Sequence, residues 1–157
     1  MKLPNEVVLS ESLPQCKISF SFEADPEKLP TITSAVSAHQ YLLSVWDLDS
    51  INYKEEFYVL LLNNSKKCMG WSKISSGGRT ATIVEPAMVF QVAMLANASS
   101  IIVAHNHPSG VLSASIADIS VTKKLLDIGN LLNIILEDHI IVGQSEYLSF
   151  LEEGMIK

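Results

Sequence analysis

The chain has 157 residues, of which 48% are hydrophobic and 18% charged, and its net charge of −6 gives a pI of about 5.1. This length suits one compact domain with a sizeable core. The two cysteines, Cys16 and Cys68, are far apart and form no CxxC motif, so the sequence suggests neither a disulfide scaffold nor a cysteine zinc site. The acidic balance disfavours a large DNA-binding face, and no apolar run reaches the roughly 18 residues of a membrane span.

The chain begins with a stretch that has little periodicity. Residues 1–30 are predicted to be an N-terminal extension that holds one alternating strand at 17–22, and residues 31–157 to be the main domain. Because residues 1–14 lack the continuous apolar segment of a signal peptide, we expect a cytoplasmic protein with no membrane contact. A helix is predicted from Thr31 or Thr33 to Asp47.

Apolar runs define the central part of the chain. A continuous apolar run at 57–62 predicts a strand at 55–63 that is buried on both faces, and residues 68–74 are predicted to be its returning partner. Residues 86–97 predict a helix that is apolar almost all round and therefore largely buried. The next strand, 101–104, leads into two histidines.

The remaining segments alternate between helix and strand. A third helix is predicted at 115–130, with Gly129 and Asn130 as its stop, followed by strands at 131–136 and 139–142 and a short closing helix at 146–152. The inward residues of the third helix are predicted to be Ile116, Ile119, Leu125, Leu126 and Ile128. Strands that alternate with helices predict a layered α/β domain.

The chemistry is predicted to lie between the strand at 101–104 and the third helix, in the pattern H-x-H-x7-S-x2-D. His105 and His107 are two residues apart at a strand end, so their side chains point the same way and can reach one metal ion. Asp118 would be the third ligand, which leaves a fourth zinc position open, as in catalytic sites. Ser115 could donate a hydrogen bond to a developing oxyanion, or form a helix capping box with Asp118; the two roles are compatible.

This pattern is the JAMM metalloprotease signature of the JAB/MPN superfamily, and the run at 105–110, HNHPSG, resembles the RadC (UPF0758-type) family within it. Residues 138–143, 147–150 and 55–63 resemble further motifs of that family, in the right order. The resemblance implies an α/β fold with a mixed sheet flanked by helices, similar to cytidine deaminases. It also implies one zinc ion per chain and hydrolysis of peptide or isopeptide bonds in a protein or peptide substrate.

A JAMM site also needs a carboxylate that moves a proton from water to the leaving amine. Glu55 and Glu56 are the candidates, and strand alternation allows only one of them to face the metal. The RadC pattern E-x-F selects Glu55, which we prefer, whereas the wider JAMM pattern would select Glu56. The carboxylate that faces away is predicted to be a solvated strand-end charge.

Other polar residues have weaker predictions. Asp138 is a candidate partner for a metal-bound histidine through its neighbour His139, although a pair that holds the sheet together is the more ordinary interpretation. His39 is predicted to be at the surface. Asn106, between the two ligands, is predicted to point away from the metal and to pin the loop.

Three functions compete at this stage. We favour a zinc metallohydrolase; the alternatives are a DNA-repair-associated RadC-like protein and a non-catalytic, metal-stabilised binding module. Residues 1–30 do not resemble the helix-hairpin-helix region that RadC proteins often carry, and the acidic charge also counts against DNA. Two departures from the family pattern, Ala87-Met88 after Pro86 and Ala114 before Ser115, leave the presumed ligands intact. The sequence predicts neither a particular substrate nor an oligomeric state.

Overall fold

A computed structural model of the chain describes residues 25–77 and 84–157. The predicted strand at 17–22 lies outside the described residues. The elements of the described residues, in chain order, are the 3-10 helix η1 (Pro26–Lys28), α1 (Ala35–Val45), β1 (Glu56–Leu62), β2 (Cys68–Ser76), α2 (Pro86–Leu95), β3 (Ser100–Asn106), α3 (Ile116–Leu132), β4 (Ile135–Val142) and β5 (Tyr147–Ser149).

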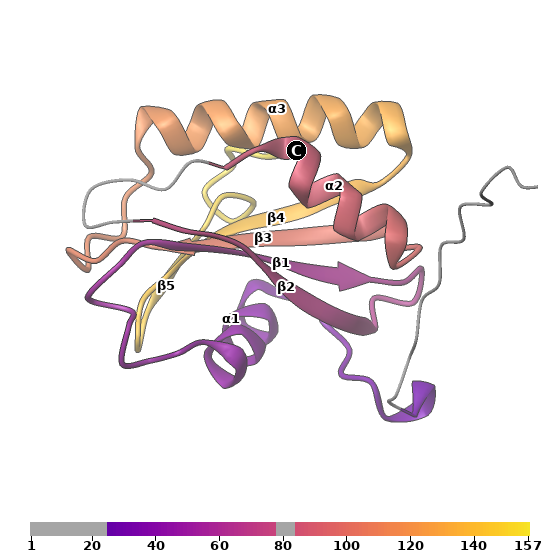
Figure 1. The fold of residues 1–157 in the computed structure, drawn as a ribbon, viewed down its shortest axis with the longest axis horizontal. Helices are drawn as coiled ribbons and strands as arrows, with labels where there is room; N and C mark the ends of the chain where they lie inside the picture. Colours follow the sequence, from indigo (N-terminus) through magenta and orange to yellow (C-terminus); the bar gives the residue numbers. More distant parts are fainter. Residues whose placement is uncertain (1–24, 78–83) are drawn as a thin grey trace, which may run out of the picture.

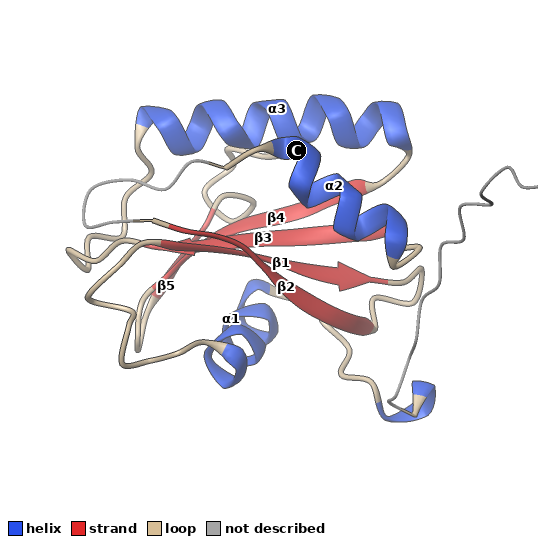
Figure 2. Cartoon of the chain, in the orientation of Figure 1, coloured by secondary structure: helices blue, strands red, loops and turns tan. Residues whose placement is uncertain are grey.

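The strands form one mixed sheet in the order β2-β1-β3-β4-β5, in which only β3 and β4 are parallel. Helices α2 and α3 cover one face of this sheet and α1 the other (Figures 1 and 2). Because both faces are covered, β1 and β3 are buried along their whole length. The predicted layered α/β architecture is confirmed. None of the helices in the described ranges combines the length and the apolar character that a membrane crossing requires.

The C-terminal third differs from the prediction because α3 is longer than expected. It continues through Gly129 to Leu132 and ends at Asn133, whose φ of 55° is left-handed. Gly129 is required inside the helix, since a Cβ there would lie 2.5 Å from the carbonyl oxygen of Ile134. The two predicted strands are therefore one, β4, and the predicted closing helix is wrong because residues 147–149 form β5 against β4.

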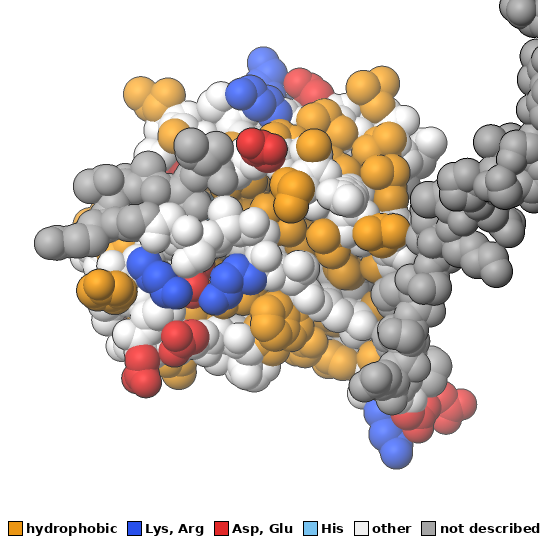
Figure 3. Space-filling model, viewed as in Figure 1, with side chains coloured by type: hydrophobic (Ala, Val, Ile, Leu, Met, Phe, Trp, Pro, Cys, Tyr) orange, Lys and Arg blue, Asp and Glu red, His pale blue; other side chains and the backbone are white. Residues whose placement is uncertain are grey.

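The faces of two helices were also predicted incorrectly. Helix α3 buries Asp118, Thr122, Leu125 and Gly129, whereas Ile116 is 89% exposed and Ile119 is 50% exposed. Its inward stripe is partly polar, which is why apolar spacing failed to locate it. Helix α2 is not buried all round: hydrophobic side chains gather over it at the surface (Figure 3), and they include Met88, Met94 and Leu95.

Helix α1 begins later than predicted and carries a buried histidine. Ser34, rather than Thr31 or Thr33, caps it by accepting a hydrogen bond from the backbone N–H of Ser37. His39 was predicted at the surface but is buried, because its Nε2 lies 2.9 Å from the carbonyl oxygen of Gly143. This contact connects α1 to the end of β4.

Candidate metal centre

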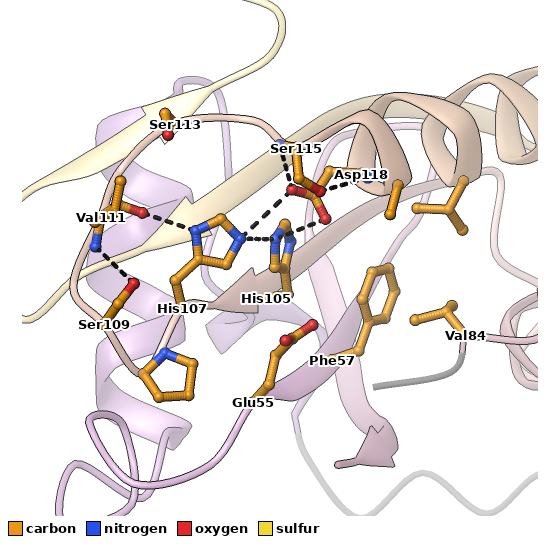
Figure 4. Close-up of a pocket in the computed structure, with 13 residues that line it drawn as sticks. Glu55, Phe57, Val84, His105, His107, Ser109, Val111, Ser113, Ser115 and Asp118 are labelled. Carbon is orange, nitrogen blue, oxygen red and sulfur yellow. Dashed lines mark hydrogen bonds and ion pairs between the residues drawn. The ribbon is translucent and has the colours of Figure 1, made fainter. Parts of the chain in front are cut away.

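Three side chains meet where β3 ends and α3 begins. His105 lies in β3, His107 follows it directly, and Asp118 lies in the first turn of α3. The Nε2 atoms of the two histidines are 3.0 Å apart, and they lie 3.2 and 3.4 Å from the carboxylate oxygens of Asp118 (Figure 4). One ligand atom from each residue lies within 4.8 Å of the others, so the three residues are close enough to form a metal site.

Backbone groups orient the two outer members of this cluster. The Nδ1–H of His107 donates to the carbonyl oxygen of Val111 over 2.7 Å, which directs Nε2 inward. The backbone N–H of Ser115 donates to Asp118 Oδ2 over 2.7 Å, and the N–H of Asp118 donates back to Ser115 Oγ over 3.1 Å. The predicted capping box is therefore present, and it leaves the hydroxyl hydrogen of Ser115 free to donate elsewhere.

His105 is oriented by His139, and this contact was not predicted from the sequence. Its Nδ1 lies 2.8 Å from Nε2 of His139 in β4, and both rings are buried. Asp138 is not the partner of a metal ligand. Its carboxylate accepts hydrogen bonds from Ser149 Oγ at 2.6 Å, from the His139 backbone at 2.7 Å and from the Leu151 backbone at 3.0 Å, so it ties β4 to β5 and the turn beyond.

The pKa values of the cluster residues depend on the hydrogen bonds between them. Burial alone would raise the pKa of Asp118, but hydrogen bonds with His105 and His107 outweigh it and hold that pKa well below its usual value. The hydrogen bond with Asp118 in turn raises the pKa of His107. Burial lowers the pKa of His139 well below its ordinary value, so its ring is neutral. Two imidazole nitrogens and one carboxylate therefore face a common point, a donor set that fits a three-ligand zinc site.

The two candidate carboxylates have different surroundings. Glu55 lines the same pocket as the three ligands, and in Figure 4 its carboxylate points toward the histidines. Glu56 points to the opposite face of the sheet, where its fully buried carboxylate pairs with Lys73 at 2.7 Å and Lys54 at 2.9 Å and accepts from Ser50 Oγ at 3.1 Å. The prediction that the outward-facing glutamate would be solvated is therefore wrong.

Asn106 connects the two strands that carry these groups. Its buried amide nitrogen donates to the carbonyl oxygens of Ile51 at 2.6 Å and Lys54 at 2.9 Å, while its Oδ1 accepts from the backbone N–H of Glu56 at 2.8 Å. The side chain thus points away from the ligands and fixes the loop before β1, as expected from its place between them.

The cluster lies in a pocket of about 550 Å³. Its polar lining residues include the three ligands with Glu55 and Ser115, and its apolar lining residues include Phe57, Val84 and Val121. Among the described residues that line it there is no Lys or Arg. The pocket therefore presents negative charge and lone pairs beside an apolar wall.

Comparison with known proteins agrees with this geometry. Residues 32–155 match the family model for the RadC-like JAB domain. A UPF0758 protein of Flavobacterium johnsoniae is 43% identical over 101 residues, which cover 64% of this chain and 44% of that protein. UPF0758 proteins of Methanosarcina mazei and Listeria monocytogenes are each 42% identical, over 66% and 65% of this chain and 45% and 46% of their own lengths. The matched part of the chain thus spans less than half the length of these curated relatives.

Proposed function

Because the chain belongs to the RadC-like JAB domain family, we propose that it is a zinc-dependent hydrolase of peptide or isopeptide bonds. His105, His107 and Asp118 would hold the ion. The JAB/MPN superfamily includes hydrolases, whereas the UPF0758 names of the relatives do not specify a reaction. The observation that carries the proposal is the convergence of three ligand atoms in one pocket with a second carboxylate, that of Glu55, which has no ion-pair partner among the described residues.

Each residue has a distinct task in this proposal. Zinc, when bound, would polarise a substrate carbonyl and lower the pKa of water toward about 7. Glu55 takes a proton on its carboxylate from the attacking water and passes it to the leaving nitrogen. Ser115, whose Oγ already accepts from the Asp118 backbone, donates its own hydrogen to the oxygen of the scissile carbonyl.

The pocket favours a peptide over a nucleic acid. A phosphodiester brings negative charge, which needs Lys or Arg nearby, yet the described lining residues contribute Glu55 and Asp118 and no cationic side chain. The apolar wall formed by Phe57, Val84 and Val121 suits a hydrophobic side chain next to the cleaved bond. A protein or peptide substrate is therefore the class we propose.

The first test is metal content, measured by mass spectrometry on untagged protein purified without chelator. We expect close to one zinc per chain, and loss of that zinc in His107→Ala. Protein that is folded yet stays metal-free after zinc is added would contradict the proposal.

The second test separates Glu55 from its neighbour. With a cleavable substrate from a peptide and isopeptide library, Glu55→Gln should keep zinc but lose about 10²–10⁴-fold in turnover. Glu56→Gln is the matched control, and it should keep both zinc and turnover. Equal turnover in wild-type protein and Glu55→Gln would remove Glu55 from the reaction.

A further inference from the structure

A chain of buried hydrogen bonds runs from His105 back to the helix that carries Asp118. His105 Nδ1 lies 2.8 Å from His139 Nε2, and His139 Nδ1 lies 2.6 Å from Thr122 Oγ1. Thr122 Oγ1 in turn lies 2.6 Å from the backbone carbonyl oxygen of Asp118. We call Thr122, His139 and His105 the tautomer relay. All three side chains are buried, so water cannot replace a missing partner.

The donor and the acceptor of each of these hydrogen bonds follow from the bond between Thr122 and the carbonyl oxygen of Asp118. A carbonyl oxygen can only accept, so Thr122 uses its single hydrogen to donate to Asp118. Its oxygen then accepts from His139, which places the His139 proton on Nδ1 and leaves a lone pair on Nε2. That lone pair accepts from His105 Nδ1–H, and the remaining lone pair of His105, on Nε2, faces Asp118 and His107.

Packing holds the middle of the relay in place. The His139 ring stacks on Phe150 with ring centres 4.5 Å apart, and it meets the edge of Phe57 at 5.7 Å. In the sheet His139 is in register with Val103, and both project onto the face that carries His105. The ring therefore has no room to turn its other edge toward His105 without disturbing the core.

We infer that Thr122 and His139 are positioning residues that fix His105 in the tautomer needed for metal ligation. The inference rests on the proposed function for the presence of the ion, and it explains why a helix threonine and a strand histidine, neither of which lies at the pocket, are buried against the cluster. Groups that orient metal-bound histidines in this way typically change metal affinity by about 10–100-fold when they are lost.

The test compares variants in pairs that keep or remove one relay bond. Thr122→Val has the same shape without the hydroxyl, and Thr122→Ser keeps it. His139→Phe keeps the stacking on Phe150, and His139→Gln places an accepting amide oxygen near the position of Nε2. Zinc dissociation constants are measured by competition with a chromophoric chelator, and unfolding temperatures of the metal-free variants report on the fold.

We expect zinc affinity to fall by about 10–100-fold in Thr122→Val and His139→Phe, and to stay close to wild type in Thr122→Ser and His139→Gln. In the zinc-loaded wild-type protein, nitrogen-15 NMR of the histidine rings should show the His139 proton on Nδ1. Wild-type affinity in all four variants, or a proton on His139 Nε2, would overturn the relay alone. Failure of the wild-type protein to bind zinc would overturn the proposed function as well.

Discussion

The two faces of the sheet each bury a polar cluster, and the clusters differ in how their charges are balanced. On the face covered by α1, the Glu56 network supplies its own counter-charges, since Lys54 and Lys73 both contact one carboxylate. On the face covered by α2 and α3, the metal-ligand cluster (His105, His107 and Asp118) contains one carboxylate and two imidazoles and no Lys or Arg. The Glu56 network is electrostatically complete without a ligand, whereas the metal-ligand cluster would gain its cation only from the proposed zinc ion.

The largest expected effect comes from a substitution in the metal-ligand cluster. Asp118→Asn should abolish zinc binding, because it removes the charged ligand while a side chain that can still cap the helix remains. At zinc concentrations about 100-fold above the dissociation constant, the wild-type protein should gain about 2.7 kcal/mol in its free energy of unfolding, and the variant none. Asp127→Asn, exposed on the same helix, is the matched control. A zinc-dependent gain in Asp118→Asn would contradict the assignment of this ligand.

The next effect concerns Asn106, whose side chain fixes the loop before β1. Asn106→Ala removes three hydrogen bonds, two of them buried, and it should lower the free energy of unfolding by about 2–3 kcal/mol. Because the loop that ends in Glu55 is released, turnover should fall further than zinc affinity does. Urea denaturation and chelator competition measure the two quantities, and a loss of stability below about 0.5 kcal/mol would show that the loop is held by other contacts.

A substitution in the Glu56 network should change the stability of the protein and leave its zinc affinity unchanged. Glu56→Gln removes the charge that pairs with two lysines whose side chains are 31% and 35% exposed. Because these partners remain partly hydrated, we expect a loss of about 1–2 kcal/mol in the free energy of unfolding, less than for a fully buried pair. Zinc affinity should match the wild-type value; a large change in affinity would mean that the two faces are not independent.

The smallest effect is the pH dependence of the difference in unfolding free energy between wild-type protein and Glu56→Gln. Burial alone would raise the pKa of Glu56, but hydrogen bonds from Lys73 and Lys54 outweigh it and lower the pKa below its ordinary value of 4.5. A lowered pKa in the folded state contributes stability that is complete above the unfolded pKa and disappears as the pH falls through the folded one. The gap between wild-type protein and Glu56→Gln should therefore be constant near neutral pH and shrink below about pH 4.5. Denaturation curves from pH 7 to about pH 3 test this, and a gap that widens in acid would contradict it.

Much of the arrangement around the pocket could be predicted because it depends on local chain geometry. His105 and His107 are two residues apart at a strand end, and Ser115 and Asp118 lie within one helical turn, so spacing alone places each pair together. Alternation along β1 also separates Glu55 from Glu56. The catalytic roles of Glu55 and Ser115 remain predictions.

The parts that sequence reasoning missed depend on contacts between distant segments. His139 reaches His105 only through the parallel register of β3 and β4, and Lys73 reaches Glu56 only through the pairing of β1 and β2. Nothing in the sequence around Thr122 distinguishes it from other threonines in helices. Since Thr122 and Asp118 occupy the inward stripe of α3, the apolar pattern there pointed to residues that are exposed, such as Ile116.

The tautomer relay connects the backbone carbonyl oxygen of Asp118 to Nε2 of His105, which in turn faces the carboxylate of Asp118. A substitution that removes a donor or an acceptor at one member leaves its neighbour without a partner, so we expect only replacements that keep the hydrogen bond, such as Thr122→Ser, to be neutral. We therefore expect the residues at 105, 122 and 139 to be inherited as a unit among relatives. A lineage that abandons the metal should be free to lose all three.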